Sequence, residues 1–404
     1  MRRTRTALLS VAGIVAAILP TGIPSAAAAA AAPGGPQACV SSPKTEGGQA
    51  ARVRDVVRQA SQDLHLNSVV FKVDSGDRDV VTGAVGESMT GVPADPAMHF
   101  RSGSVAIEYM ATVLLQLVDE GKVSLDDPVS RWLPTLPHAS EITLRMLGSS
   151  TSGLHDYVTD KKFLAELEAA PFRHWSFSDV VGIATAPPLW YKPGTSWSYS
   201  HANFQILGVA LEKITGTPLD RLLAERITTP LALKGTHNAF TPEIPAPALH
   251  AFTSERGVYE ESTYWNPSWT TAAGAVLTSD ICDLARSARA IGSGELLSPQ
   301  GLRTLLDPGT VGLGGKTGTC PADVCLKNTA AQHFGFGVLV VHDWILQNPS
   351  FSGYAAVQAY LPAQKLSIAV TTTQGPKATE QNPGQTIAAR IAQVLAPDHP
   401  LTTH

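Results

Sequence analysis

Hydrophobic positions along the chain form strand-like runs at both ends and helix-like spacings between them. Near the N-terminus, apolar residues at helical spacing predict a helix over residues 49–64, and residues 68–73 and 79–85 then alternate as two strands around a short turn. Near the C-terminus, four strand-like runs precede a helix over residues 385–395. The four runs cover residues 334–342, 344–348, 353–361 and 365–373.

The middle of the chain is mainly helical in pattern. Helical spacing covers residues 142–147, 202–214, 219–227, 278–291 and 299–306, whereas residues 151–218 are otherwise rich in loops around the second of these helices. Together these patterns predict an α+β fold with two lobes. One mainly antiparallel sheet is built from both chain ends and flanked by the terminal helices, and the other lobe is mostly helical.

These boundaries predict one domain over residues 48–398. Its sheet lobe would contain about residues 48–100 and 300–398, and its helical lobe about residues 101–299. A site is expected at the seam between the lobes, because pockets form where two packed units meet.

Residues 100–117 place a serine at the start of an amphipathic helix. Met110, Val113, Leu114 and Leu117 recur on one face after Ser104. The amide dipoles at a helix start favour negative charge, so Ser104 is a candidate nucleophile. As an alternative, Ser104 simply caps the helix. Glu108, four residues later, could act as a carboxylate base, but we expect it to be a charged surface residue flanking the serine.

The first 32 residues have the features of an export signal. A basic head with three arginines precedes an apolar run that is short for a membrane span and a tail rich in alanine. Residues 33–47 read as a disordered leader. We therefore expect a secreted, extracytoplasmic protein without an integral membrane span in its mature form.

Charge and cysteine content narrow the expected partners. Removal of the three arginines changes the net charge of −4 to about −7, which argues against a nucleic-acid partner. Four cysteines in an exported protein suggest disulfides. Cys320 and Cys325 flank a short loop that a bridge could close. Cys39 and Cys282 either pair, or Cys282 is a buried free thiol.

Several blocks, in order, resemble a known superfamily. They are FRSGSVAIEYMATVLLQLVDEGKVSLDDPVSRWLP, ITLRMLGSSTSGLHDY, KPGTSWSYSHANFQILGVALEKITG and NPSWTTAAGAVLTSDICDLARSARA. The ordered set resembles the serine beta-lactamases and penicillin-binding proteins, and within them the branch of DD-carboxypeptidases, class C beta-lactamases and esterases. The resemblance covers nearly all of the mature chain and implies a beta-lactamase-like fold.

The family's first motif, Ser-x-x-Lys, is incomplete in this chain. Residues i and i+3 share a helix face, so the family's lysine amine can take the serine proton. Here Ser104 is present, but the lysine position is Ile107, whose alkyl side chain cannot accept a proton.

The second motif, Tyr-x-Asn, reads Tyr199-Ser200-His201. The resemblance implies a proton relay for Tyr199. An imidazole is a better base near neutral pH than the amide it replaces, so Ser104, Tyr199 and His201 could form a relay. The alternative is a packing or solvent-facing His201. His155 is a reserve candidate for the base.

The third motif, Lys/His-x-Gly, has two possible positions. Lys316-Thr317-Gly318 matches it literally, but lies before the C-terminal strand run. Gln347-Asn348-Pro349 has the family's position in the order and lacks both the cation and the glycine. We favour the second position, so Gln347 and Asn348 are substrate-binding candidates, with Lys316 as the other.

Two functions follow from these residues. The first is an exported serine hydrolase that acts by acyl transfer on a cell-wall peptide, an amide or an ester through Ser104. The second is a catalytically impaired pseudoenzyme that binds peptidoglycan fragments or a protein partner in the same cleft. The histidines and cysteines have no metal-ligand spacing, and no cofactor is expected. The sequence leaves the oligomeric state open.

Overall fold

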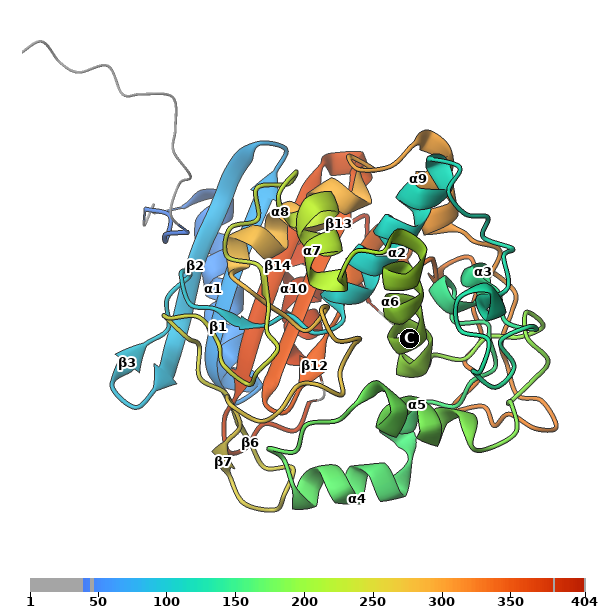
Figure 1. The fold of residues 1–404 in the computed structure, drawn as a ribbon. Coiled ribbons are helices and arrows are strands. Elements are labelled where there is room, and N and C mark those ends of the chain that lie inside the picture. Colours follow the sequence, from blue (N-terminus) through green and yellow to red (C-terminus); the bar gives the residue numbers. More distant parts are fainter. Residues whose placement is uncertain (1–38, 44–46, 381, 403–404) are drawn as a thin grey trace, which may run out of the picture. The chain divides into compact units, whose positions relative to one another are not determined.

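A large antiparallel sheet is the centre of the fold. The computed structural model describes residues 39–43, 47–380 and 382–402. Within them the sheet has nine strands in the order β3-β2-β1-β14-β13-β11-β10-β9, with β12 paired to β13 (Figure 1). The strands are β1 (Leu66–Ser75), β2 (Arg78–Met89), β3 (Val92–Pro93), β9 (Gln332–Phe334), β10 (Leu339–Val341), β11 (Trp344–Gln347), β12 (Ser350–Phe351), β13 (Tyr354–Leu361) and β14 (Leu366–Gln374).

The predicted sheet from both chain ends is confirmed by the pairing of β1 with β14. These strands run antiparallel, with Val70 opposite Thr371 and Ser75 opposite Leu366. Almost every residue of β13 and β14 is buried, because helices cover both faces of the sheet. The expected mixed α+β class is therefore correct.

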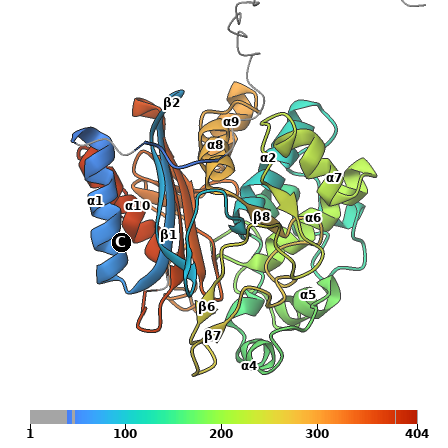
Figure 2. The ribbon, with the colours of Figure 1, turned by 90° about the vertical axis from the view of Figure 1, so that its left-hand side faces the viewer.

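The terminal helices form the outer layer. Helices α1 (Gly48–Asp63) and α10 (Pro383–Leu395) lie side by side on one face of the sheet (Figure 2). Val53 and Val57 of α1 pack with Ile387 and Ile391 of α10 in a core that includes Trp344 of β11. The strand alternation therefore sends Trp344 and Leu346 to this outer core.

The opposite face of the sheet carries the second, larger core. Helix α8 (Ile281–Gly292) contacts β1, β11, β13 and β14, and the helical lobe lies beyond it. That lobe contains α2 (Val105–Asp119), α3 (Leu144–Gly148), α4 (Lys161–Ala169), α5 (Phe177–Thr185), α6 (His201–Thr215), α7 (Leu219–Leu223) and α9 (Pro299–Leu306). The expected boundary of the helical lobe at residue 299 therefore differs from the structure, since α8 packs on the sheet.

Two small sheets connect the lobes. Strands β4 (Phe100–Arg101), β8 (Leu277–Ser279) and β5 (His237–Asn238) form one, and β6 (Phe252–Thr253) with β7 (Glu260–Glu261) forms the other. Strand β4 leads directly into α2. It therefore fixes where that helix begins.

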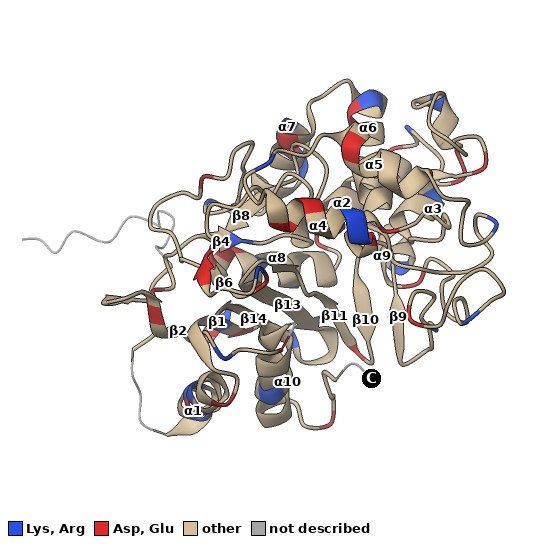
Figure 3. Ribbon diagram, turned by 90° about the horizontal axis from the view of Figure 1, so that it is seen from below, with Lys and Arg blue, Asp and Glu red and all other residues tan. Residues whose placement is uncertain are grey.

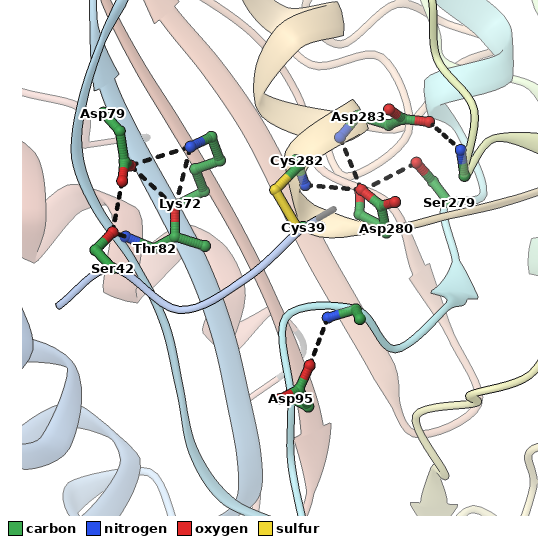
Figure 4. Close-up of a disulfide and its surroundings, with 12 residues drawn as sticks. Cys39, Ser42, Lys72, Asp79, Thr82, Asp95, Ser279, Asp280, Cys282 and Asp283 are labelled. Atoms are coloured by element: carbon green, nitrogen blue, oxygen red, sulfur yellow. Dashed lines mark hydrogen bonds and ion pairs between the residues drawn. A yellow bond between two sulfur atoms is a disulfide. The ribbon is translucent and has the colours of Figure 1, made fainter. Parts of the chain in front are cut away.

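Two disulfides join distant or neighbouring segments. Cys39 is bonded to Cys282 of α8 (Figure 4), and Cys320 is bonded to Cys325. The free-thiol alternative for Cys282 is therefore wrong. Residues 39–43 of the predicted leader are held against β2, because the Ser42 amide donates to Thr82 O at 2.9 Å. The predicted signal segment and residues 33–38 and 44–46 of the leader lie outside the described residues.

No helix among residues 39–43, 47–380 and 382–402 is both long and apolar enough to cross a bilayer. Acidic and basic side chains are interspersed along the ribbon (Figure 3).

Candidate active site

Ser104 is the residue from which α2 begins. It occupies the N-cap position with φ −64° and ψ −5°, and its carbonyl accepts the Ile107 amide at 2.9 Å. Its own backbone N–H has no hydrogen-bond partner among the described residues. A free amide and the helix dipole meet at this serine, so negative charge on an oxygen beside it would be stabilised.

Tyr199 lies against Ser104 from the helical lobe. The two hydroxyl groups lie close enough for the serine to act on the pKa of the tyrosine. Burial raises the pKa of Tyr199, the nearby Asp156 carboxylate raises it further, and the neighbouring Ser104 hydroxyl acts in the opposite direction. The phenol therefore stays protonated at neutral pH. It can pass a proton along a chain but cannot serve as a standing base.

His201 forms a pair with Asp156, which the sequence analysis did not identify. The imidazole Nδ1 lies 3.1 Å from both Asp156 carboxylate oxygens, and the His201 amide lies 3.2 Å from Oδ1. The His201 ring meets the Tyr199 ring edge-on, with centroids 5.0 Å apart. Within the described residues His201 makes no hydrogen bond to Tyr199 or Ser104. The structure thus brings the three residues together without closing the relay.

Ile107 and Glu108 lie in the first turn of α2, directly after Ser104. Ile107 is fully buried in the larger core. Glu108 is 2% exposed, so the expected surface position is wrong. Its carboxyl accepts a hydrogen bond from Gln358 of β13, and burial raises its pKa well above the usual value.

Gln347 lies on the strand beside the nucleophile. A Cβ on Gly103 would lie 2.8 Å from the Pro349 Cβ, which brings the end of β11 next to Ser104. The Gln347 side chain is buried, and its Nε2 donates to Gly337 O at 2.5 Å. The position that would offer a cation to a substrate is therefore a neutral amide already engaged with the backbone.

Asn348 faces away from this site. Its Nδ2 donates to Gln385 Oε1 of α10 at 2.7 Å, on the outer side of the sheet. Neighbouring strand residues point to opposite faces, so Gln347 and Asn348 cannot both face Ser104. The prediction that Asn348 contacts substrate is therefore wrong.

Lys316 lies in the loop that precedes the second disulfide, four residues before Cys320. It is exposed and belongs to no strand. The Thr317 amide donates to Cys320 O at 2.9 Å, and Thr319 donates to Trp190 O, so this loop folds on itself against the helical lobe. The structure brings Lys316 into no contact with Ser104, Tyr199 or His201 among the described residues.

Ser104, Tyr199 and the end of β11 lie together, as the sequence resemblance implies. The family model described as Beta-lactamase matches residues 53–393. This chain belongs to the beta-lactamase family.

Curated relatives of this beta-lactamase family protein include different activities. Over 225 residues it is 25% identical to a putative penicillin-binding protein, PbpX, of Bacillus subtilis (strain 168). The matched region covers 54% of each chain. Over 198 residues it is 29% identical to esterase EstB of Burkholderia gladioli, which covers 46% of this chain and 50% of the other. The chain spans about half the length of these relatives. The family is one of serine hydrolases that includes penicillin-binding proteins, carboxypeptidases and esterases.

Solved structures share the fold over most of the chain. A D-stereospecific amidohydrolase from Streptomyces sp. has a TM-score of 0.68 at 24% identity and covers 84% of this chain and 97% of its own. The D-amino acid amidase of Ochrobactrum anthropi SV3 has a TM-score of 0.70 at 19% identity, with 85% and 99% covered. These likenesses establish the beta-lactamase-like architecture.

His155, the reserve candidate for the base, contacts other residues than Ser104. The His155 ring stacks on Trp190 with centroids 3.8 Å apart, and its Nε2 lies 2.9 Å from Pro188 O. Burial lowers the pKa of His155. In the described part of the chain, the residues close enough to share a metal ion are Cys39, Asp280 and Cys282, but their two sulfurs are bonded to each other.

Proposed function

We propose that this beta-lactamase family protein is an exported serine hydrolase that transfers an acyl group from an ester or amide to Ser104 and then to water. The proximity of the Ser104 and Tyr199 hydroxyl groups carries this proposal, because the phenol is a group that can move the serine proton.

The proposed chemistry uses four residues of the site. Ser104 Oγ attacks the substrate carbonyl while its proton passes to Tyr199, and Tyr199 releases its own proton to His201 oriented by Asp156. The Ser104 amide stabilises the oxyanion. The imidazolium then protonates the leaving group, and water completes the cycle by the same path. The relay requires His201 to reach the Tyr199 oxygen in the substrate complex.

The missing amine favours some substrates over others. A positioned acid or base typically contributes about 10²–10⁴-fold to a rate, so replacement by Ile107 should slow acylation strongly. An ester with a good leaving group depends less on proton transfer than a peptide amide does. We therefore expect small esters to react faster than peptidoglycan-type peptides. The neutral Gln347 also favours substrates without a carboxylate at that position.

Export belongs to the same proposal. The signal-like first 32 residues support it, and so do the two disulfides, since disulfides form in oxidising compartments. Mass analysis of protein recovered from the culture medium would test it. We expect a mature N-terminus between the alanine-rich tail and Cys39, and retention of the uncut chain in the cytoplasm would refute export.

Intact-mass analysis tests the chemistry. Wild-type protein and Ser104→Ala are incubated separately with p-nitrophenyl acetate, penicillin and a fluorophosphonate. We expect a covalent adduct on the wild type with the ester or the fluorophosphonate, and none on Ser104→Ala. No adduct with any reagent would leave the nucleophile without function.

A second candidate function is binding without turnover. It is favoured by the burial of Ile107 in the core, which removes the proton acceptor from the nucleophile's helix. The cleft would then hold a peptidoglycan fragment or a protein partner. Ile107→Lys separates the two candidates. If this change creates or sharply raises ester hydrolysis, the missing amine was the block, and the wild type is at most a slow enzyme.

A further inference from the structure

One buried side chain holds the backbone on both sides of Tyr199. The Ser150 hydroxyl donates to Ser198 O at 2.9 Å and accepts the Ser200 amide at 3.2 Å. Because Ser198 precedes Tyr199 and Ser200 follows it, these two bonds fix the segment from which the phenol projects. Ser150 lies just after α3, so the bonds also join two parts of the helical lobe that are distant in the sequence.

Asn203 uses the remaining bonding capacity of the Ser150 hydroxyl. Its Nδ2 donates to Ser150 Oγ at 2.9 Å and to Ser200 O at 3.2 Å, and its Oδ1 accepts from Ser152 Oγ at 2.6 Å. A hydroxyl group offers one donor and two acceptor positions, and Ser150 uses all three. Ser150 and Asn203 are fully buried, so water does not compete for these bonds. The network therefore holds Ser150 in one orientation.

The backbone of Ser150 lies in the left-handed region, with φ +56°. Few residues other than glycine adopt this conformation, because a Cβ is crowded there. Glycine at this position would avoid the strain but would lack the hydroxyl. Residues strained in this way cluster at functional sites, where the surrounding structure holds them in place. The strain indicates that the hydroxyl of Ser150 has a role that offsets it.

The two segments that Ser150 joins also carry the Asp156–His201 pair. Ser200 Oγ donates to His155 O at 2.8 Å, directly before Asp156 in the chain. The His201 amide lies 3.2 Å from Asp156 Oδ1. A shift of one segment against the other would therefore move the Tyr199 hydroxyl and disturb this pair at the same time.

We propose that Ser150 is a positioning residue for acyl transfer, and that its hydroxyl sets the place of the Tyr199 oxygen beside Ser104. This inference rests on the proposed function, in which Tyr199 takes the serine proton. Ser150 acts through the backbone around Tyr199 and does not touch the substrate. Proton transfer needs the two oxygens within about 2.6–3.2 Å, so a looser Tyr199 segment should slow the chemical step more than it weakens substrate binding.

Ser150→Gly tests the inference, because it removes the hydroxyl and suits the left-handed backbone. We expect kcat with p-nitrophenyl acetate to fall about 10-fold while KM stays within about 2-fold. The rate at which a fluorophosphonate labels Ser104, followed by intact mass, should fall by the same factor. A kcat and a labelling rate within about 2-fold of the wild type would overturn the inference, and so would a rise in KM alone.

Ser149→Ala is the matched control. Ser149 is the neighbouring serine and is also buried, but its hydroxyl donates to Arg145 O at 2.8 Å and lies 3.0 Å from Thr151 Oγ1. We expect the wild-type kcat from this variant, and an equal loss in both serine variants would overturn the inference. The urea unfolding midpoint of each variant is measured first. If Ser150→Gly does not fold, Ser150→Cys replaces it, because a thiol has nearly the same shape and forms weaker hydrogen bonds.

A double variant separates positioning from general loosening of the fold. In a Tyr199→Phe background the phenol oxygen is already absent, so Ser150→Gly should lower the labelling rate by less than about 2-fold. A loss of about 10-fold in both backgrounds would overturn the inference. If the wild type is not labelled, or if Tyr199→Phe is labelled as fast, the proposed function is wrong and the inference falls with it. If Tyr199→Phe is slow and Ser150→Gly is not, the inference alone is wrong.

Discussion

At the scale of single residues, a buried polar chain lies beneath the nucleophile helix. Gln358 of β13 donates to Glu108 of α2 and accepts from Ser287 of α8 at 3.0 Å. It therefore links three elements at the contact between the sheet and the helical lobe. Such a network stabilises the fold only while every member is paired.

Glu108→Gln should raise the free energy of unfolding at pH 8. The folded-state pKa of Glu108 is raised by burial, so its contribution to stability is present at low pH and is lost as the pH rises. Glutamine can accept the same hydrogen bond from Gln358 and does not titrate. Urea unfolding at pH 8 measures the difference.

A matched variant tests the network itself. Glu108→Leu leaves Gln358 without its acceptor and should lower the free energy of unfolding by about 1–3 kcal/mol. If Glu108→Gln is as destabilising as Glu108→Leu at pH 8, the carboxylate charge stabilises the protein and our interpretation is wrong.

Asp283 should make stability depend on pH in an accessible range. Burial and the neighbouring Asp280 raise the pKa of Asp283 to about 6, whereas hydrogen bonds from Gly235 and Thr236 oppose the shift. A raised carboxyl pKa means that stability present below pH 4 is lost as the pH rises through about 6. Asp283→Asn lacks this loss, so its stability relative to the wild type should increase by roughly 1–3 kcal/mol between pH 4 and 7.5. Thermal unfolding across that range would show parallel curves if the assignment is incorrect.

Loss of the Asp156–His201 pair should lower the rate of ester hydrolysis, because the proposed relay passes through His201. With an activated ester, His201→Asn and Asp156→Asn should each lower kcat/KM by about 10- to 100-fold, and the double variant should lose little more. Tyr199→Phe should lose at least as much. An unchanged rate in His201→Asn would remove the imidazole from the mechanism.

The sequence predicts some of these residues and not others. Ser104 and Tyr199 are found from motifs, because each lies in a recognisable local block. Asp156 is missed because its role depends on His201, which is 45 positions away and approaches only in the folded chain. Asn348 is misassigned because the motif names neighbours, whereas a strand turns them to opposite faces.

At the scale of elements, the turn before β10 presses on the nucleophile helix. Gly337 has φ +74°, and a Cβ there would lie 2.5 Å from the Ala111 Cβ and 3.1 Å from Ile107 O. The close approach explains why the single strand predicted over residues 334–342 is two strands. The chain must turn at Gly337 to let α2 pass.

Gly337→Ala should therefore destabilise the protein by about 2–4 kcal/mol, from backbone strain and overpacking together. Gly257→Ala is the control, because Gly257 has φ +81° and no atom within 4 Å of a Cβ. It should lose only the backbone contribution of about 1 kcal/mol. Equal losses in the two variants, measured by urea unfolding, would show that contact with α2 is unimportant.

Other elements depend on signals that hydrophobic spacing does not carry. Helices α4 and α5 lie in the segment predicted as loop-rich, and each begins at a capping residue. Asp160 accepts from the Phe163 amide, and Ser176 and Asp179 form a capping box. Each helix has only 9 residues, so a hydrophobic period repeats little more than twice in it, and the caps are the sequence signal that could have revealed these helices.

At the scale of the whole molecule, the order of strand-like runs predicts the sheet and its outer helices well. It does not predict that α8 covers the inner face of the sheet. An amphipathic pattern shows which side of a helix is buried, but it does not show which element that side packs against. The long-range disulfide from Cys39 marks that position, because it ties the leader to α8 beside β2.

The two disulfides should contribute unequally to stability. Cross-linking across a separation of 243 residues restricts the unfolded chain far more than a separation of 5 does. Chain-entropy estimates give about 5 and about 2 kcal/mol. The double variant Cys39→Ala/Cys282→Ala should therefore lose more stability in denaturant than Cys320→Ala/Cys325→Ala. The reverse order would mean that the short bridge mainly holds native structure against Trp190 and Tyr191.

The pairing of β1 with β14 has a consequence for the order in which the protein can be made. The hairpin of β1 and β2 emerges from the ribosome before the helical lobe, but β14, which pairs with the other edge of β1, follows only after that lobe. Until then, the edge of β1 offers unpaired backbone groups to any neighbouring chain. A nascent copy is therefore exposed to aggregation while the helical lobe is being synthesised. Helper proteins that mask strand edges should matter more for its yield than for its final stability.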